Sequence, residues 1–176
     1  MTIKKIIVEV FLDNNIINIA QSAFYMCTNL AKISLPQLLE SIGQTAFIYC
    51  TSLLEINFPS TLINIGNYAF AYCSKLEEIY INDNIQTIGG FAFRKCSSVS
   101  KITIGKNVTT LGDRAFGEIN PYEVICKSKS LSAGSGYGFQ QDDRKKIINL
   151  TITDDVVSLG AKFVYYSSSA YAPRLG

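Results

Sequence analysis

The stretch CSKLEEIYINDNIQTIGGFAF at residues 73–93 decides the fold, because its apolar residues recur along the chain at a fixed interval. The Ala-Phe pair that ends it occurs five times, and each step is 23 residues. The pairs begin at Ala23, Ala46, Ala69, Ala92 and Ala115. A period of roughly 20–50 residues predicts a solenoid, in which stacking of neighbouring repeats buries the core.

The other apolar positions keep the same register. In the quoted stretch, Ile79 and Ile81 alternate with period two, which predicts a short strand. The Ile88-Gly89 pair predicts a tight turn, because glycine adopts a positive φ without steric cost. The following Ala-Phe pair predicts a helical or 3₁₀ turn that runs to the next cysteine. A strand and a short turn in each repeat are typical of a leucine-rich-repeat coil.

The pattern C-x-x-L-x-x-I-x-L-P-x-x-L-x-x-I-G-x-x-A-F is almost intact from Phe24 to Phe116, and it resembles the BspA-like leucine-rich repeats of bacterial and protozoan surface proteins. We therefore expect a repeat solenoid of the α/β leucine-rich-repeat type with about seven right-handed coils. Its parallel sheet would form the concave face, and short helical or 3₁₀ turns would form the convex face. The resemblance also implies attachment to host or matrix proteins and a cell-surface or extracellular location.

A single solenoid domain is expected over residues 1–176, with regular 23-residue repeats at 23–126. The remaining segments are a partial coil, an irregular insertion, a last coil and a tail, at 1–22, 127–146, 147–164 and 165–176. Across the irregular part, Ile125 and Phe139 are expected in register with Ile102 and Phe116. The residues Leu150, Ile152, Val156, Leu159 and Gly160 each lie 48 positions after Ile102, Ile104, Val108, Leu111 and Gly112.

The composition excludes several classes of function. The formal net charge of +2 is too small for a typical nucleic-acid-binding surface. The chain contains no histidine, so catalytic triads and sites that need a histidine ligand cannot form. No segment resembles a membrane span or a signal peptide, which leaves an intracellular location open.

Four cysteines, Cys27, Cys50, Cys73 and Cys96, share the 23-residue step. Equivalent residues of stacked coils form a row with a spacing of about 4.8 Å, so four collinear sulfurs cannot surround one metal ion. We expect them to be small buried core residues, and we expect no metal and no cofactor. Cys126 lies in the irregular part and is expected to be the one candidate for an exposed, reactive thiol.

The outward positions of the strands form the first candidate binding surface, on the concave sheet. Its predicted residues are Phe11, Lys32, Glu55, Asn57, Glu78, Tyr80 and Lys101. The opposite charges in this set also fit a solvated face on which neighbouring charges compensate. The functional alternative is a recognition surface centred on Tyr80 and Phe11.

The second candidate surface lies on the aromatic side of the solenoid, around the predicted turns. Its residues are Tyr49, Tyr68, Tyr72, Phe91 and Arg94. Aromatic and arginine side chains are enriched at interface hot spots. The alternative is that these rings pack along the convex side and cover the buried phenylalanines.

Two functions follow. The first is a non-enzymatic module that binds a protein ligand through one of these surfaces. The second is a structural component that self-associates or docks in a larger assembly through the solenoid ends or the C-terminal tail. An enzyme is not expected, because no motif places a pair of carboxylates, and Glu55 and Glu78 lie on an open sheet beside lysines.

Overall fold

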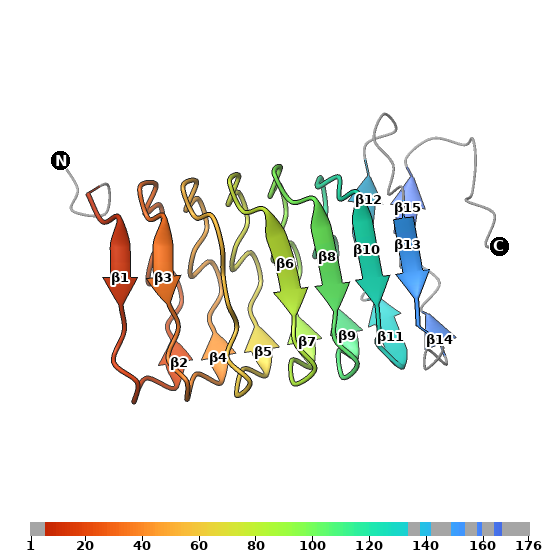
Figure 1. The fold of residues 1–176 in the computed structure, drawn as a ribbon, viewed down its shortest axis with the longest axis horizontal. Helices are drawn as coiled ribbons and strands as arrows, with labels where there is room; N and C mark the ends of the chain where they lie inside the picture. Colours follow the sequence, from red (N-terminus) through yellow and green to blue (C-terminus); the bar gives the residue numbers. More distant parts are fainter. Residues whose placement is uncertain (1–5, 134–137, 142–148, 154–157, 160–163, 167–176) are drawn as a thin grey trace.

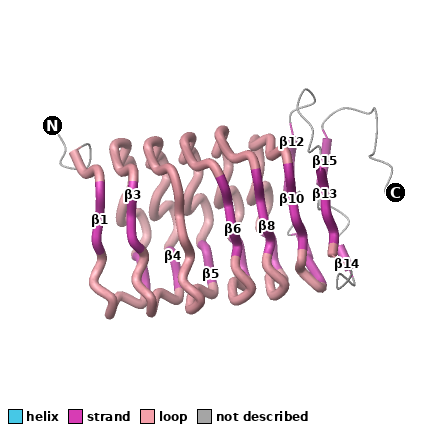
Figure 2. The backbone as a smooth tube through the Cα atoms, in the orientation of Figure 1, coloured by secondary structure: helices cyan, strands magenta, loops and turns pink. Residues whose placement is uncertain are grey.

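The computed structural model describes residues 6–133, 138–141, 149–153, 158–159 and 164–166, which form a solenoid of coils stacked along one axis (Figure 1). Most coils contribute one strand to a front row and a shorter strand to a second row (Figure 2). All paired strands in these ranges run parallel. The expected leucine-rich-repeat solenoid with a parallel sheet is thereby confirmed.

The front row consists of six strands in two separate sheets. They are β1 (Glu9–Phe11), β3 (Lys32–Ser34), β6 (Glu78–Ile81), β8 (Lys101–Ile104), β10 (Glu123–Cys126) and β13 (Asn149–Ile152). β1 pairs with β3, whereas β6, β8, β10 and β13 form a four-stranded sheet. The third coil lies between these two sheets and has no front strand of its own.

The second row is one continuous sheet of seven strands. It contains β2 (Asn18–Ile19), β4 (Ser41–Ile42), β5 (Asn64–Ile65), β7 (Thr87–Ile88), β9 (Thr110–Leu111), β11 (Ser130–Ala133) and β14 (Ser158–Leu159). A further pair joins β12 (Phe139–Gln141) to β15 (Val164–Tyr166). Because β11 and β12 lie within 127–146, the segment expected to be an irregular insertion contains two strands.

The turns differ from the expected helical or 3₁₀ form, since the described residues contain no helix. Within residues 45–50, alternate amides donate to carbonyls in the same turn, and the others donate to carbonyls of the next coil. Thr45 and Tyr49 have φ values of 53° and 62°. These left-handed residues interrupt any helical run, so every second amide can bond to the neighbouring coil.

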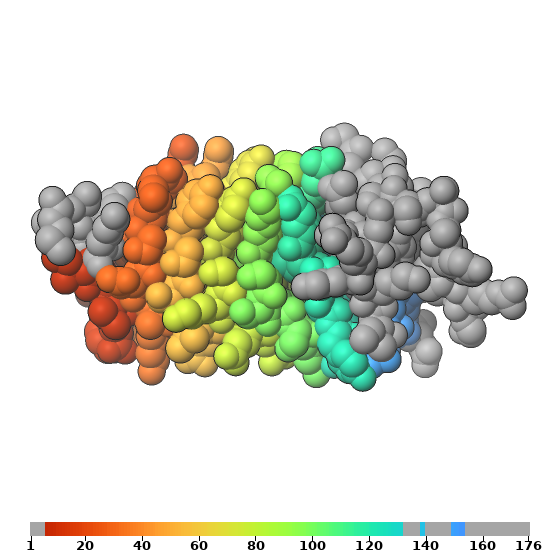
Figure 3. Space-filling view, turned by 90° about the horizontal axis from the view of Figure 1, so that it is seen from above, coloured from red at the N-terminus to blue at the C-terminus, as the bar shows by residue number. Residues whose placement is uncertain are grey.

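A ladder of phenylalanine rings forms the centre of the core. The rings of Phe24, Phe47, Phe70, Phe93, Phe116 and Phe139 stack with centroids 4.8 to 5.5 Å apart. All except Phe24 are fully buried. Phe139 therefore lies in register with Phe116, as the 23-residue step predicts. Seen from above, the same coils form closely packed parallel bands (Figure 3).

Glycine recurs at positions 89 and 112 of successive coils, but the reason is not the expected positive φ. No glycine in the described residues adopts a positive φ. A Cβ atom at Gly89 would instead lie 2.5 Å from the backbone nitrogen of Asn67, and one at Gly112 would lie 2.1 Å from that of Gly90. Glycine is needed here because backbones of neighbouring coils approach closely.

The predicted register of Ile125 is wrong by one residue. β10 pairs Val124 with Ile102 and Cys126 with Ile104. The chain between Phe116 and β10 is one residue shorter than in the regular coils, which brings Cys126 to a buried position. Leu150 pairs with Val124, so its expected equivalence to Ile102 is confirmed.

The second row contains a further departure from the expected register. Leu111 pairs with Ala133, whereas Leu159 pairs with Leu131, two residues earlier in β11. Leu111 and Leu159 are therefore not equivalent across this strand. Val156, Gly160 and the tail from residue 167 onward lie outside the described residues. Within the described part of the chain, no helix has the length and apolar character needed to cross a membrane.

Candidate functional site

The front sheet exposes two outward rows of side chains, which we call the sheet face. Its charged row contains Lys32, Glu55 and Glu78, all exposed, and Lys101, which is half-buried. Its second row contains Phe11, Asn57 and Tyr80, with Phe11 76% and Tyr80 52% exposed. Exposed rings of this size on a regular sheet are available to a partner.

The charges of the sheet face are only partly compensated. β6 and β8 place Glu78 opposite Lys101, but the Lys101 Nζ atom lies 3.1 Å from Glu123 Oε2 on the other side. No ion pair in the described residues involves Lys32, Glu55 or Glu78. On β8, Thr103 pairs with Tyr80 on one side and with Ile125 on the other, and it is only 4% exposed.

The third coil interrupts the front row at residues 55–58. In the described structure no backbone-to-backbone hydrogen bond joins these residues to either neighbouring coil, although Asn82 Nδ2 donates to the Phe58 carbonyl oxygen. Phe58 occupies the position of Leu35 and Ile81, and its ring packs edge-on to Phe70 and Phe93 at centroid distances of 5.7 and 6.4 Å. An aromatic ring needs more room than an aliphatic side chain at this position, which accounts for the loss of regular pairing.

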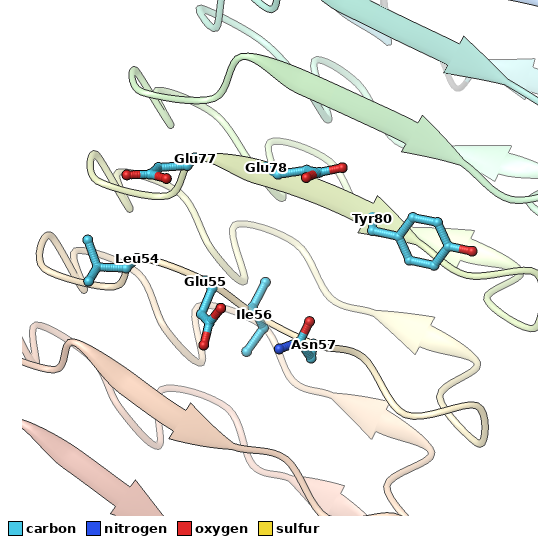
Figure 4. Close-up of a pocket in the computed structure, with 7 residues that line it drawn as sticks. All are labelled: Leu54, Glu55, Ile56, Asn57, Glu77, Glu78 and Tyr80. Atoms are coloured by element: carbon cyan, nitrogen blue, oxygen red, sulfur yellow. The ribbon is translucent and has the colours of Figure 1, made fainter.

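A hollow of about 400 Å³ lies on the sheet face between the third coil and β6 (Figure 4). It is lined by Leu54, Glu55, Ile56, Asn57, Glu77, Glu78 and Tyr80. The repeat pattern predicts Glu55, Asn57, Glu78 and Tyr80 on this face, but it does not single out Leu54, Ile56 or Glu77. The signal that could have located the hollow is Phe58, the one aromatic residue among Leu35, Phe58, Ile81 and Ile104.

The aromatic side of the solenoid is arranged as two stacked pairs. Tyr49 and Tyr72 stack with ring centroids 4.4 Å apart, and Tyr68 and Phe91 stack at 4.8 Å. All four residues are half-buried and have positive φ. Each ring therefore has one face covered by its stacking partner.

Cations cover part of these stacked pairs. Arg94 lies over the Phe91 ring at 5.6 Å, and Lys95 lies over the Tyr72 ring at 5.3 Å. Both cations also form ion pairs with Glu118. Desolvation raises the pKa of Glu118, but the hydrogen bond and charge of Arg94 outweigh it and the pKa is lowered. Arg94 is thus already engaged within the chain.

The cysteines are buried and act as weak hydrogen-bond donors. The Sγ atoms of Cys50, Cys73 and Cys96 lie 3.2 to 3.3 Å from phenylalanine carbonyl oxygens of the preceding coil. Desolvation raises the pKa of Cys96 to about 12. Cys126 is also fully buried, and desolvation raises its pKa, so this candidate is not an exposed thiol. Among the described residues, no three potential metal ligands come together.

The repeat pattern matches the family described as "BspA type Leucine rich repeat region", with six copies over residues 4–122, more than half of the chain. The comparison with curated proteins gave no match.

Three solved structures are similar to this solenoid. A Treponema pallidum (T. pallidum) leucine-rich repeat protein is 28% identical, with a TM-score of 0.54 over 68% of this chain and 73% of that protein. A leucine-rich cell surface protein of Faecalibacterium prausnitzii is 23% identical, with a TM-score of 0.68 over 88% of this chain and 40% of that chain. The pneumococcal vaccine antigen PcpA is 20% identical, with a TM-score of 0.66 over 84% of this chain and 42% of its own. This chain therefore spans about two fifths of the last two structures, which share its fold.

Proposed function

Because the chain belongs to the BspA-type leucine-rich repeat family, we propose that it is a non-enzymatic module that binds a protein ligand through its sheet face. Leucine-rich repeats are typically used for protein interaction, and solenoids offer extended surfaces for it. A surface location and an adhesive role belong to the same proposal. The location is supported by the F. prausnitzii structure, which is that of a cell surface protein.

The observation that carries the proposal is the difference between the two candidate surfaces. Phe11 and Tyr80 present exposed rings on the sheet face. The rings of the aromatic side stack on one another, and Arg94 is held by Glu118. An interface hot spot needs a ring that a partner can cover, and the sheet face offers such rings.

Binding to a panel of purified matrix proteins tests the proposal. The immobilised chain is exposed to collagen, fibronectin, laminin and fibrinogen, and saturable binding to at least one is expected. The double variant Phe11→Ser/Tyr80→Ser should weaken this binding by about tenfold or more, as loss of hot-spot residues does. The matched control Met26→Ser/Leu38→Ser replaces two other exposed apolar residues and should leave the affinity unchanged. Absence of binding to every protein, or equal loss in the control, contradicts the proposal.

A second candidate function, assembly through a solenoid end, rests on the first coil. Among the described residues, ten large apolar residues are exposed, and six of them fall within residues 6–26, namely Ile6, Val8, Phe11, Ile17, Tyr25 and Met26. Exposed apolar surface at a solenoid end favours stacking against another surface. Light scattering over a concentration series should then show association that decreases in Ile6→Ser/Val8→Ser. A monomer at all concentrations contradicts this second candidate.

A further inference from the structure

The hollow between the third coil and β6 is distinct from the rest of the sheet face. It forms where residues 55–58 lack pairing with the neighbouring coils. Pockets for small molecules occupy about 300–1,000 Å³, so a hollow of about 400 Å³ has room for a single large side chain. Its position near the middle of the sheet face places it where a protein ligand would be centred.

The charge of the hollow is negative and locally uncompensated. Glu55, Glu77 and Glu78 line it, and none of them forms an ion pair among the described residues. The nearest paired cation on the same sheet, Lys101, is held by Glu123. A ligand group that enters the hollow therefore meets three carboxylates that no ion pair among the described residues neutralises.

The shape of the hollow distinguishes between kinds of cation. Figure 4 shows the carboxylates of Glu77 and Glu78 extending in different directions from one coil, with Glu55 on the other. A metal ion needs oxygen ligands that converge on one point, and no such group exists among the described residues. A guanidinium has five N–H donors in a planar fork, so it can reach carboxylates that lie apart.

Tyr80 adds a second feature that favours a guanidinium. Tyr80 lines the hollow and is 52% exposed. Guanidinium planes stack on aromatic faces, whereas the compact and strongly hydrated ammonium of lysine gains less from such a surface. The Asn57 side chain and the backbone carbonyls of residues 55–57 offer further acceptors.

We infer that the hollow receives the guanidinium of an arginine side chain carried by the partner protein. The inference rests on the proposed function of the sheet face and names the chemistry of its partner. Arginine is enriched among the residues that anchor protein interfaces in pockets, and here its charge complements that of the hollow.

A peptide titration followed by nuclear magnetic resonance tests this inference without knowledge of the partner. The probes are acetyl-Gly-Arg-Gly-amide, its citrulline analogue, which keeps the shape but lacks the charge, and its lysine analogue. Saturable amide shifts confined to residues 54–57 and 77–80 are expected with the arginine peptide. They should weaken as salt is added, because the contacts are exposed to solvent.

Two matched variants assign the effect to the hollow. Glu55→Gln/Glu78→Gln should weaken binding of the arginine peptide by about fivefold or more, as loss of two exposed ion pairs predicts. Glu9→Gln/Glu40→Gln removes the same charge at exposed positions outside the hollow and should leave binding unchanged. Equal binding of the citrulline or lysine peptide, or equal loss in both variants, overturns the inference.

The two proposals fail in different ways. If a matrix protein binds the sheet face but Glu55→Gln/Glu78→Gln leaves its affinity unchanged, the binding function stands and the arginine inference is wrong. If the arginine peptide binds the hollow but no matrix protein binds the chain, the proposed function is contradicted, whereas the preference of the hollow for a guanidinium is confirmed.

Discussion

The cysteines of the regular coils are hydrogen-bond donors within the core. Each sulfur of Cys50, Cys73 and Cys96 faces a phenylalanine carbonyl of the preceding coil. A buried thiol in such a place is stable only when protonated, because desolvation penalises the thiolate. Loss of the thiol proton is therefore coupled to unfolding, and the buried thiol does not act as a nucleophile in the folded chain.

The stability of the chain should depend on pH through Cys96. Its folded-state pKa of about 12 lies above the ordinary value of 9.0, so the unfolded chain loses this proton first as the pH rises. The contribution of the protonated Cys96 thiol to the free energy of unfolding is complete below pH 9, and it is lost between pH 9 and about 12. In Cys96→Ala, the fall in the free energy of unfolding above pH 9.5 should be shallower by about 1.4 kcal/mol per pH unit. Urea titrations at several pH values measure this slope, and identical slopes would contradict the prediction.

Cys126 should resist alkylation in the folded chain. It is fully buried, and desolvation raises its pKa. N-ethylmaleimide at pH 8 should label it about 100-fold more slowly than in guanidinium chloride, as read by mass spectrometry of the peptides. An exposed cysteine introduced by Glu40→Cys provides the control for reagent activity. Rapid labelling of native Cys126 would show that its burial is wrong.

At the level of the elements, neighbouring glycines have different roles. The path of the chain at Gly89 leaves no room for a Cβ atom, whereas the nearest atom to a Cβ at Gly90 lies 3.4 Å away. Both residues follow β7, so they share a turn and nearly the same environment. Substitutions at these two positions therefore distinguish the effect of close backbone approach from the other effects of replacing a glycine.

Alanine at these two positions should have different effects on stability. Gly89→Ala forces neighbouring coils apart and should lower the free energy of unfolding by about 2–3 kcal/mol. Gly90→Ala introduces no backbone clash and should change it by less than about 1 kcal/mol. Urea denaturation of both variants compares them directly. Equal losses would mean that the contact at Gly89 does not require glycine.

The elements show why some features follow from the sequence and others do not. The step of 23 residues predicts the position of Phe139, because identical coils stack in register. The same step misplaces Ile125, since its neighbour Val124 is equally apolar and a one-residue deletion leaves the hydrophobic pattern plausible. The left-handed turn residues also escape prediction, because tyrosine, lysine and glutamate occupy positions where glycine or asparagine would signal positive φ.

On the scale of the whole molecule, each coil buries its apolar side chains by packing them against the neighbouring coils. Phe70 stacks between Phe47 and Phe93, whereas Phe24 has a stacking partner on one side and is half-buried. In a stack of this kind, a substitution that unfolds a central coil removes two interfaces between coils, and one that unfolds an end coil removes one.

The candidate site depends on the same organisation, because the hollow lies where one coil departs from the others. Phe58 satisfies the hydrophobic pattern as well as Leu35 does, so the hollow could not be predicted from the pattern alone.

A buried charge should therefore have an effect that depends on its place in the stack. Phe70→Asp should abolish the cooperative unfolding transition and the sheet signal in circular dichroism, because a carboxylate at a fully buried position cannot be solvated. Phe24→Asp should retain both and accelerate amide exchange only in the first coil. Exchange measured residue by residue distinguishes the two. A native spectrum for Phe70→Asp would contradict the buried ladder.

The amides of each coil link it to its two neighbours through different segments. In successive coils the amides of Phe24, Phe47, Phe70 and Phe93 donate to the coil that follows, and so do those of left-handed turn residues such as Met26, Tyr49 and Tyr72. The amides of Gly43, Gly66, Gly89 and Gly112, which come directly after strands of the second row, donate to the coil that precedes. Because the peptide dipoles of these two segments point in opposite directions along the axis, they oppose each other, unlike the aligned dipoles of a helix. Lengthening the stack therefore adds hydrogen bonds without building up the large end charges of a helix of equal length.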